Sequence, residues 1–379
     1  MQPLSGLKIL DFSTLLPGPL ATLILAEAGA DVLKIERPGT GDDMRSFPPF
    51  VAGESALFAL LNRGKRSLAI DLKAADAWST LEPLVQGADV LVEQFRPGVM
   101  DRLGLGYDRL RTINPRLVYC SITGYGQDGP KANVVGHDLT YLAEAGVLAQ
   151  AKLGSVPPVL AADIAGGAYP AVMNILLALR QRDASGRGVH LDIAMAEQSL
   201  TFAVGGLAEL WTGGRSPAPG GWLLTGGSPR YQLYITSDGQ WVAAAPLEQK
   251  FWQRFCELIQ LPAELRDDRR DPEATRAGVE RRIASEPADH WRRLFAGEDV
   301  STAVVTTLEG AVADPQVAAR GVLAHRLAVG GREMPALPVP VAAGFRRPPE
   351  TDAAPGLDPA PGSPEVQTPP SLGSDRHLY

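Results

Sequence analysis

Cysteine is almost absent from this sequence, which has only Cys120 and Cys256 among its 379 residues. Two cysteines so far apart form neither a disulfide framework nor the closely spaced ligand pairs of a zinc site. We therefore predict no metal centre and a reducing, cytoplasmic location. The first cysteine falls in a predicted buried strand and the second in a predicted helix.

Long apolar runs and an excess of positive charge are absent as well. The N-terminal stretch MQPLSGLKIL does not join a basic segment to a long apolar one, and no window of about 18 apolar residues occurs. The formal net charge is −7, which argues against a nucleic-acid or anionic membrane surface but leaves room for local basic clusters that bind phosphate groups. We expect no export signal, no membrane span and no nucleic-acid partner.

Alternating strands and helices fill the first third of the sequence. Apolar runs predict strands over 7–12, 31–36, 67–71, 90–93 and 117–122, with helical patterns between them. This alternation is typical of a parallel, doubly wound α/β sheet. Farther along, the pattern predicts a helix over 164–182, a strand over 189–193 and a helix over 194–210.

The domain boundaries are expected where the composition changes. Residues 212–230 are rich in glycine and proline and predict a linker, after which short strands and charged helices continue to about residue 320. We therefore predict a large domain over 1–211, a small α+β domain over 231–320 and a C-terminal segment over 321–379. The proline-rich part of that segment, from 346, is expected to be extended over a partner surface or partly disordered.

The spacing Gly124-x-Gly126-x-x-Gly129 after a predicted strand looks like a dinucleotide-binding fingerprint. Such a site needs the glycines to open a helix directly. Here Asp128-Gly129-Pro130 predicts a turn, and no helix is expected before about residue 138. We therefore reject a nicotinamide dinucleotide site and predict a glycine-rich loop at the end of a strand, where open α/β sheets bind their ligands.

This loop leads to His137 and Asp138 at the start of a predicted helix. From the residues alone, Asp138 could simply cap that helix and His137 could be an exposed loop residue. Asp163 is open to the same interpretation, because aspartate is a common helix cap. The pair Gly166-Gly167 behind it disfavours a plain helix and indicates close approach of another segment.

Seven sequence blocks carry a resemblance to a known family. They are LKILDFSTLLPGPLATLILAEAGADVLKIERPG, LNRGKRSLAIDLK, VLVEQFRPGVMDRLGLGYDRL, NPRLVYCSITGYGQDGP, GHDLTYLAEAG, AADIAGGAYPAVMNILLAL and YITSDGQWVAAAPLEQKFW. Over residues 4 to 345 the sequence resembles the class III CoA-transferase family (CaiB/BaiF), which also contains the α-methylacyl-CoA racemases. The resemblance implies a Rossmann-like large domain completed by the C-terminal segment, a small domain between its parts, and an interlocked homodimer.

The same resemblance implies a substrate and a set of binding residues. An acyl-CoA is expected, with no cofactor beyond its CoA moiety. Basic side chains suit the phosphates of CoA. The residues expected to line the CoA-thioester site are Arg37, Ile70, Asp71, Leu72, Lys73, Gln94, Phe95, Arg96, Arg102, Gly136, Asp138 and Tyr141.

For the chemistry, the resemblance assigns His137, Asp163 and Glu248. A racemase needs two acid–base groups on opposite faces of the substrate α-carbon, and His137 with Asp163 meets that requirement. Glu248 is expected to support the histidine, although a first-turn acid favoured by the helix dipole is an equal alternative. One departure is Arg230, a bulky cation where racemases usually carry a small apolar or aromatic residue.

Three functions remain open. The leading hypothesis is epimerisation of a 2-methylacyl-CoA through an enolate. The alternative is transfer of CoA from a thioester to a free carboxylic acid through a covalent intermediate on Asp163, which needs no histidine at 137. A non-catalytic CoA-binding subunit is a third interpretation, disfavoured because both reactive residue types are present.

Overall fold

The computed structural model describes residues 2–152 and 154–357, so the predicted tail from 358 onward lies outside the described residues. The chain divides into two compact units. The first comprises the residues up to 142, residues 157–199 and the segment from 318, and the second comprises 143–156 and 200–317. Residues 143–156 and 200–211, which the sequence-based boundary assigns to the large domain, therefore fall in the second unit. The described part of the C-terminal segment, from 318 to 357, belongs to the first unit.

The first unit is built on a six-stranded sheet. Its strands are β1 (Lys8–Asp11), β2 (Asp31–Glu36), β5 (Arg66–Ala69), β6 (Val90–Glu93), β7 (Val118–Thr123) and β8 (His190–Ala194). They are ordered β5-β2-β1-β6-β7-β8, and every neighbouring pair is parallel. The predicted parallel α/β sheet is confirmed. The strands β2 and β5 lie on one side of β1, and the later strands β6, β7 and β8 lie on the other. A crevice for a ligand is therefore expected between β1 and β6, where the segments that follow these two strands separate.

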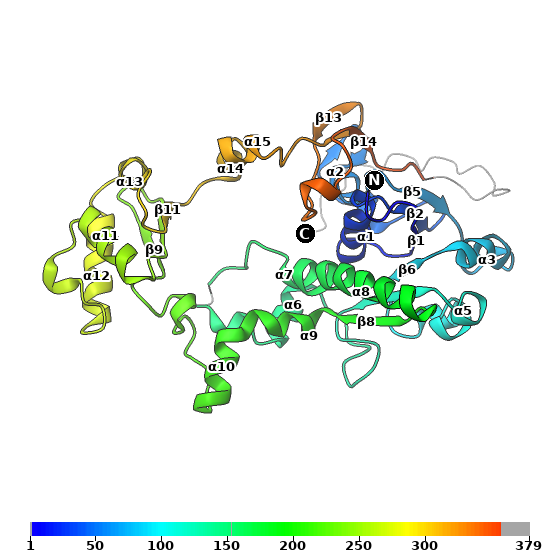
Figure 1. Cartoon of the computed structure of the whole chain (residues 1–379), viewed down its shortest axis with the longest axis horizontal. Coiled ribbons are helices and arrows are strands. Elements are labelled where there is room, and N and C mark those ends of the chain that lie inside the picture. Colours follow the sequence, from blue (N-terminus) through cyan, green and yellow to red (C-terminus); the bar gives the residue numbers. More distant parts are fainter. Residues whose placement is uncertain (1, 153, 358–379) are drawn as a thin grey trace, which may run out of the picture. The chain divides into compact units, whose positions relative to one another are not determined.

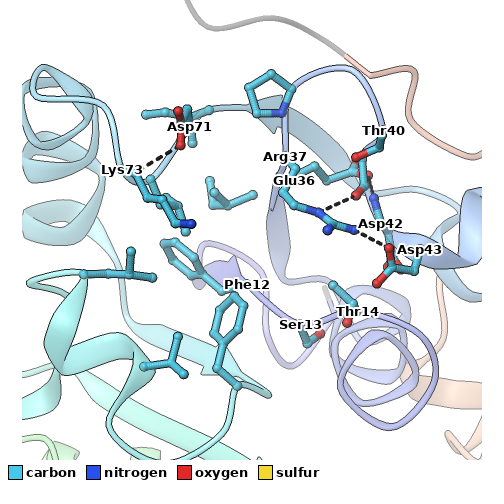
Figure 2. Close-up of a pocket in the computed structure, with 18 residues that line it drawn as sticks. Phe12, Ser13, Thr14, Glu36, Arg37, Thr40, Asp42, Asp43, Asp71 and Lys73 are labelled. Carbon is cyan, nitrogen blue, oxygen red and sulfur yellow. Dashed lines mark hydrogen bonds and ion pairs between the residues drawn. The ribbon is translucent and has the colours of Figure 1, made fainter. Parts of the chain in front are cut away.

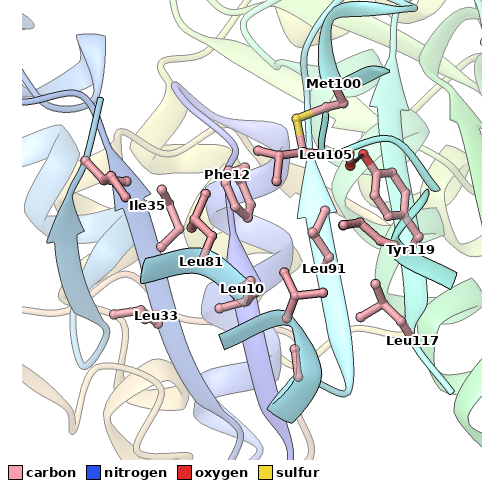
Figure 3. Packing of buried hydrophobic residues seen from close by; sticks show 14 of the residues in the cluster. Leu10, Phe12, Leu33, Ile35, Leu81, Leu91, Met100, Leu105, Leu117 and Tyr119 are labelled. Carbon is pink, nitrogen blue, oxygen red and sulfur yellow. Dashed lines mark hydrogen bonds between the residues drawn. The ribbon is translucent and has the colours of Figure 1, made fainter. Parts of the chain in front are cut away.

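Apolar strand residues form the core of this unit on one face of the sheet. Figure 3 shows Leu10, Leu33 and Leu91 projecting from neighbouring strands beside Leu81 of α3 (Ala77–Gly87), and all four are buried. Because strand side chains alternate between faces, the residues between them point the other way. There α1 (Pro17–Glu27) contacts α8 (Tyr169–Ser185), as Figure 1 also shows. Every residue of α1 is buried, which explains its apolar sequence on all sides.

Shorter elements complete the first unit. They are β3 (Phe50–Val51), β4 (Glu54–Ser55), α2 (Ala56–Asn62), α4 (Val99–Arg102), α5 (Tyr107–Ile113), α6 (Asp138–Glu144), α7 (Ala161–Asp163) and α9 (Met195–Ser199). The C-terminal segment adds the hairpin of β12 (Arg326–Val329) and β13 (Arg332–Pro335), with β14 (Thr351–Ala353) parallel to β12. The described beginning of the proline-rich tail is thus a sheet strand rather than a loose extension.

Two predicted helices differ from the structure. The helix expected over 164–182 is preceded by α7, passes through a π-helical turn over Ile164–Ala168 and continues as α8 to Ser185. By length and composition the segment Ala161–Ser185 could cross a membrane, but 56% of its apolar window is buried, as in the core helix of a folded protein. The helix expected over 194–210 is interrupted by a 3₁₀ turn at Leu200–Ala203, where the chain passes between the two units.

The second unit has a small antiparallel sheet covered by helices. Its strands are β9 (Gln232–Ile235), β10 (Trp241–Ala244) and β11 (Thr302–Val304), ordered β11-β10-β9. Its helices are α10 (Val204–Gly213), α11 (Gln249–Leu258), α12 (Pro272–Ile283), α13 (Ala288–Phe295) and α14 (Leu308–Val312), while α15 (Pro315–Ala319) crosses the boundary. Trp252, Phe255 and Trp291 are fully buried between sheet and helices. Cys256 is buried here and Cys120 in β7, both as free thiols, as their predicted elements imply.

Candidate functional site

A first cavity opens at the carboxyl ends of the strands on the β5 side of the sheet. It has a volume of about 790 Å³. Six residues expected from the sequence line it, namely Arg37, Ile70, Asp71, Leu72, Lys73 and Phe95. Figure 2 shows Arg37 and Lys73 on opposite sides of this space with Phe12 between them. Strand ends in a parallel sheet thus bring together cations that lie far apart in sequence.

Two cations of this first cavity are available to an anionic ligand. Arg37 is 61% exposed and its only ion pair in the described chain joins it to the exposed Asp43. Lys73 is exposed, and its backbone N–H, not its ammonium, donates to Asp71. Exposed cations of this kind can reach phosphate oxygens without first breaking a buried ion pair. The cavity therefore offers positive charge at its rim.

A second cavity, of about 550 Å³, lies over β6 and β7. The predicted residues that line it are Gln94, Phe95, Arg96, Gly136, His137, Tyr141 and Asp163. Phe95 lines both cavities, so they adjoin at that side chain. Most of the remaining lining is apolar and includes Leu15, Pro17 and Met195. We refer to the two spaces as the Arg37 cavity and the His137 cavity.

His137 occupies the position just before α6. Its backbone N–H donates to Thr140 Oγ1 at 2.9 Å, and that hydroxyl lies 2.8 Å from the His137 carbonyl oxygen. A hydroxyl three residues into a helix that bonds back to the preceding residue is a capping interaction. Thr140 therefore fixes the helix start and leaves the exposed His137 side chain free to face its cavity.

Asp138 neither caps its own helix nor lines a cavity, but it contacts Asp163. It is 7% exposed and lines neither cavity, and its Oδ1 accepts a hydrogen bond from the backbone N–H of Asp163 at 2.9 Å. It therefore joins the start of α6 to α7 instead of capping its own helix or contacting the cavity. This bond places His137 and Asp163 on the same lining from two separate elements.

Asp163 is not a helix cap. It is the last residue of α7, and the helical chain continues past it through the π turn. Burial, the larger cause, and the neighbouring Asp138 carboxylate together raise the pKa of its carboxyl to about 6. A carboxyl with a pKa near neutrality can both give and take a proton, which is the property expected of an acid–base group.

The glycine pair after Asp163 permits the close packing that the sequence indicates. A Cβ on Gly166 would lie 2.8 Å from the Met195 carbonyl oxygen, and one on Gly167 would lie 3.1 Å from Pro17 Cβ. Glycine thus lets the π turn approach α9 and α1. Turns of this type are frequent at functional sites. No local sequence pattern predicts this π turn.

The three glycines of the apparent fingerprint form turns and open no helix. Gly126 and Gly129 have φ values of +93° and +84°, and α6 begins only at Asp138. A Cβ on Gly124 would lie 2.5 Å from the Tyr141 ring, whose hydroxyl donates to the Gly136 carbonyl at 2.7 Å. The rejection of a dinucleotide fingerprint is therefore correct, and Tyr141 is the contact that Gly124 accommodates.

The segment after β6 is held by residues that sequence reasoning partly missed. Gln94 Oε1 accepts from the Gly18 N–H at 3.0 Å, and Glu93 Oε2 accepts from the Phe95 N–H at 2.8 Å. Burial raises the pKa of Glu93 to about 7. The signal for Glu93 is a carboxylate that ends an apolar strand, where a charged group needs a buried partner.

Two further predicted residues line neither cavity. Arg102 is exposed at the end of α4 and lines neither one. Glu248 precedes α11 in the second unit, where it is exposed and its side chain makes no capping hydrogen bond. Arg230, the unexpected cation, pairs with Asp268 at 2.6 Å and lies over the Trp252 ring. Its charge is therefore used inside the second unit.

Metal coordination has no candidate among the described residues, since no three His, Cys, Asp or Glu side chains gather there as ligands.

The comparisons with known proteins point to one family. The family model described as CoA-transferase family III matches residues 4–361. An acetyl-CoA:oxalate CoA-transferase from Acetobacter aceti is 34% identical over 369 residues, covering 94% of this chain and 93% of that protein.

A racemase and a solved structure give similar matches. The human α-methylacyl-CoA racemase is also 34% identical, over 325 residues, covering 82% of this chain and 79% of the racemase. A crystal structure of a CaiB/BaiF family protein from Brucella suis superimposes with a TM-score of 0.77 at 29% identity, covering 92% of this chain and 96% of that one. The relatives thus include both transferases and a racemase.

Proposed function

This chain belongs to CoA-transferase family III, and we propose that it epimerises 2-methylacyl-CoA thioesters through an enolate. Family members are enzymes of either kind, CoA-transferases or racemases. The observation that carries the racemase proposal is that one cavity is lined both by His137, just before α6, and by Asp163, at the end of α7. A transferase needs only the carboxylate.

In the proposed reaction one of these two groups removes the proton on the carbon next to the thioester carbonyl. The resulting enolate is then protonated on its opposite face by the other group, which inverts that centre. The pKa of Asp163 near 6 suits both directions, because the carboxyl is populated in both protonation states near neutral pH. Asp138 holds Asp163 through its backbone N–H and keeps its proton affinity high.

We place the nucleotide end of CoA in the Arg37 cavity and the acyl group in the His137 cavity. Arg37 and Lys73 supply cations for phosphate groups, and Ile70 and Phe95 supply apolar surface. Phe95 adjoins both spaces, so a thioester bound across it reaches from one to the other. The apolar lining by Leu15, Pro17 and Met195 suits an acyl chain. No cofactor beyond CoA enters this proposal.

The second candidate is CoA transfer to a free carboxylic acid through Asp163. It is favoured by Arg96, an exposed cation on the lining of the His137 cavity for which no ion pair occurs among the described residues. An arginine on the same cavity lining as the reacting carboxylate could bind an acceptor carboxylate in a bidentate manner. Here the Asp163 carboxylate attacks the thioester carbonyl, which forms a mixed anhydride and releases CoA thiolate. The thiolate then attacks the Asp163 carbonyl, which forms an aspartyl-CoA thioester and releases the donor acid. The acceptor carboxylate attacks that thioester to form a second anhydride, and the thiolate released in this step attacks the acceptor's carbonyl, giving the new acyl-CoA and free Asp163.

One experiment separates these two reactions. A 2-methylacyl-CoA is incubated with the enzyme in deuterated water, and mass spectrometry follows deuterium at the α-carbon. The racemase proposal expects exchange in the wild type and none in His137→Ala or Asp163→Ala. His290→Ala, which changes a histidine on α13 of the second unit, is the matched control and should exchange normally. Absence of exchange with several thioesters would reject the proposal, and normal CoA transfer by His137→Ala would establish the alternative.

Other properties implied by the family resemblance are part of the same proposal. We propose an interlocked homodimer in the cytoplasm, in which Glu248 supports His137. Exposed apolar side chains on α8, such as Met173 at 59% and Leu177 at 67%, are consistent with a partner covering that helix. Light scattering after size-exclusion chromatography measures the mass, and a monomer at micromolar concentration would contradict the dimer.

A further inference from the structure

The segment between β1 and α1 lies between the two cavities. Ser13 and Thr14 line the Arg37 cavity, whereas Leu15 and Pro17 line the His137 cavity. We call residues 13–17 the crossover segment. A substrate that spans both cavities has to pass this segment, so its backbone conformation affects both ends of the site.

Leu15 adopts an unusual backbone conformation in this segment. Its φ is +62°, in the left-handed region that a residue with a side chain rarely adopts. Such a conformation is less favourable for a non-glycine residue and persists only when the surrounding structure enforces it. The contacts of the crossover backbone show what enforces it here.

Three buried charged side chains hold the backbone of this segment. The Leu15 N–H donates to Asp42 Oδ1 at 3.0 Å, and the Ser13 N–H donates to Asp11 Oδ1 at 3.0 Å. The Ser13 carbonyl oxygen accepts from Lys34 Nζ at 2.7 Å. The polar backbone groups on either side of Thr14 are thus bonded to charges that come from other elements.

These charges form a closed set inside the unit. Lys34 Nζ lies 2.9 Å from Asp42 Oδ2, and both side chains are 0% exposed. Lys65 Nζ pairs with Asp11 Oδ2 at 3.1 Å, again with both side chains fully buried. Burial would raise the pKa of Asp11, but Lys34 and Lys65 together lower it well below its usual range. Asp11 therefore keeps its negative charge between the two lysines.

A buried ion pair is a poor way to stabilise a fold. The cost of removing two charges from water offsets most of their attraction, and apolar pairs of similar volume often give equal stability. What Lys34 and Asp42 provide that apolar residues cannot is directional bonds to the Ser13 carbonyl and the Leu15 N–H. Asp42 also lines the Arg37 cavity and holds the backbone of Leu15, which lines the His137 cavity.

We propose that Lys34 and Asp42 are positioning residues that hold Ser13 to Leu15, with Leu15 left-handed, so that a CoA thioester is aligned between the two cavities. This inference rests on the proposed acyl-CoA activity for its catalytic consequence. Its structural consequence, a rigid crossover segment, is independent of that activity and can be measured separately.

The main test replaces the ion pair with apolar residues in Lys34→Met/Asp42→Leu. We expect a lower melting temperature, because the Ser13 carbonyl, the Leu15 N–H and the Met44 N–H lose their partners, together with faster hydrogen exchange of the Leu15 amide and a fall of at least tenfold in kcat/KM. The matched control is Glu27→Leu/Arg63→Met, which removes another pair with both side chains 1% exposed that lines neither cavity. It should leave Leu15 exchange and kcat/KM unchanged, whatever its effect on the melting temperature.

A second test needs no change to the ion pair, in case the double variant does not fold. Leu15→Gly and Leu15→Val both shorten the side chain, but only valine disfavours a positive φ. We expect Leu15→Gly to keep a higher kcat/KM than Leu15→Val by about tenfold, although glycine removes more of the cavity lining. Glycine better than valine supports the proposal, and valine equal to or better than glycine overturns it.

Failure of this inference differs from failure of the proposed function. If the wild type neither binds CoA in a calorimetric titration nor exchanges the α-proton, the acyl-CoA function is wrong. Hydrogen exchange at Leu15 still decides the structural part, because faster exchange in Lys34→Met/Asp42→Leu supports the positioning role of the ion pair and unchanged exchange overturns it. If the wild type is active and the folded double variant has the same kcat/KM and Leu15 exchange, only this inference fails.

Discussion

The backbone N–H of Asp163 donates to the Oδ1 of Asp138 at 2.9 Å, which ties the residue after His137 to the opposite acid–base candidate. A second carboxylate so close to Asp163 has two effects. It fixes the end of α7 through a hydrogen bond, and its negative charge helps burial to keep the pKa of Asp163 near 6. These effects can be separated, because asparagine retains the acceptor oxygen and lacks the charge.

The first prediction concerns Asp138→Asn and Asp138→Ala. We expect Asp138→Asn to keep the Asp163 backbone in place and to move the Asp163 limb of the pH dependence of kcat/KM toward lower pH, because one cause of the raised pKa is removed. Asp138→Ala loses the hydrogen bond as well and should lower kcat/KM by about tenfold more. The measurement is kcat/KM from pH 4.5 to 9, and an unshifted limb in Asp138→Asn would show that its charge does not act on Asp163.

The second prediction concerns the stability cost of Asp163. The pKa of Asp163 in the folded state is above the ordinary value of this group. Its favourable contribution to the free energy of unfolding is therefore fully present below pH 3.8 and is lost as the pH rises through about 6. Asp163→Asn should therefore abolish activity and stabilise the fold at pH 8 by about 1–3 kcal/mol. The gain at pH 8 should exceed the gain at pH 5 by about 1 kcal/mol. Denaturant unfolding at both pH values measures this, and equal gains would contradict it.

The third prediction concerns Thr140, whose hydroxyl bonds the backbone of His137. Thr140→Val preserves the shape of the side chain and removes the capping bonds, so the start of α6 should fray and stability should fall by about 1 kcal/mol. Because His137 loses its fixed position, kcat should fall several-fold more than KM changes. Thr112→Val, which removes an exposed hydroxyl bond in α5, is the matched control and should keep wild-type kinetics. Wild-type kcat in Thr140→Val would mean that the cap does not position the histidine.

The strands could be predicted because their signal is local. Residues 31–36 and 90–93 are short apolar runs, and the structure has β2 and β6 at those bounds. The helix around Asp163 could not be predicted in the same way. Its π turn depends on Gly166 meeting the Met195 backbone, a contact between segments far apart in the sequence.

The site shows the same division between local and distant information. The cations of the Arg37 cavity follow strand ends, which place them at one edge of the sheet, so their grouping could be inferred. The ion pairs of Lys34 and Lys65 could not, because a lysine in an apolar strand does not reveal its partner. The role of Asp138 was also hidden, since an aspartate at a helix start has the local sequence of a cap.

The last prediction concerns the cations of the Arg37 cavity. Arg37 is 61% exposed and paired only with the exposed Asp43 among the described residues, so its loss should cost little stability. If it binds a CoA phosphate, Arg37→Ala should raise KM for the thioester about tenfold with kcat nearly unchanged, because the phosphate lies far from the reacting carbon. Arg66→Ala removes an equally exposed arginine that pairs with Asp31 and lines neither cavity, and KM should not change. Raising the salt concentration should weaken CoA binding to the wild type more than to Arg37→Ala, since screening acts on the contact that the variant has already lost. Calorimetric titration with CoA at two salt concentrations measures this, and an identical salt dependence in both proteins would remove Arg37 from the binding site.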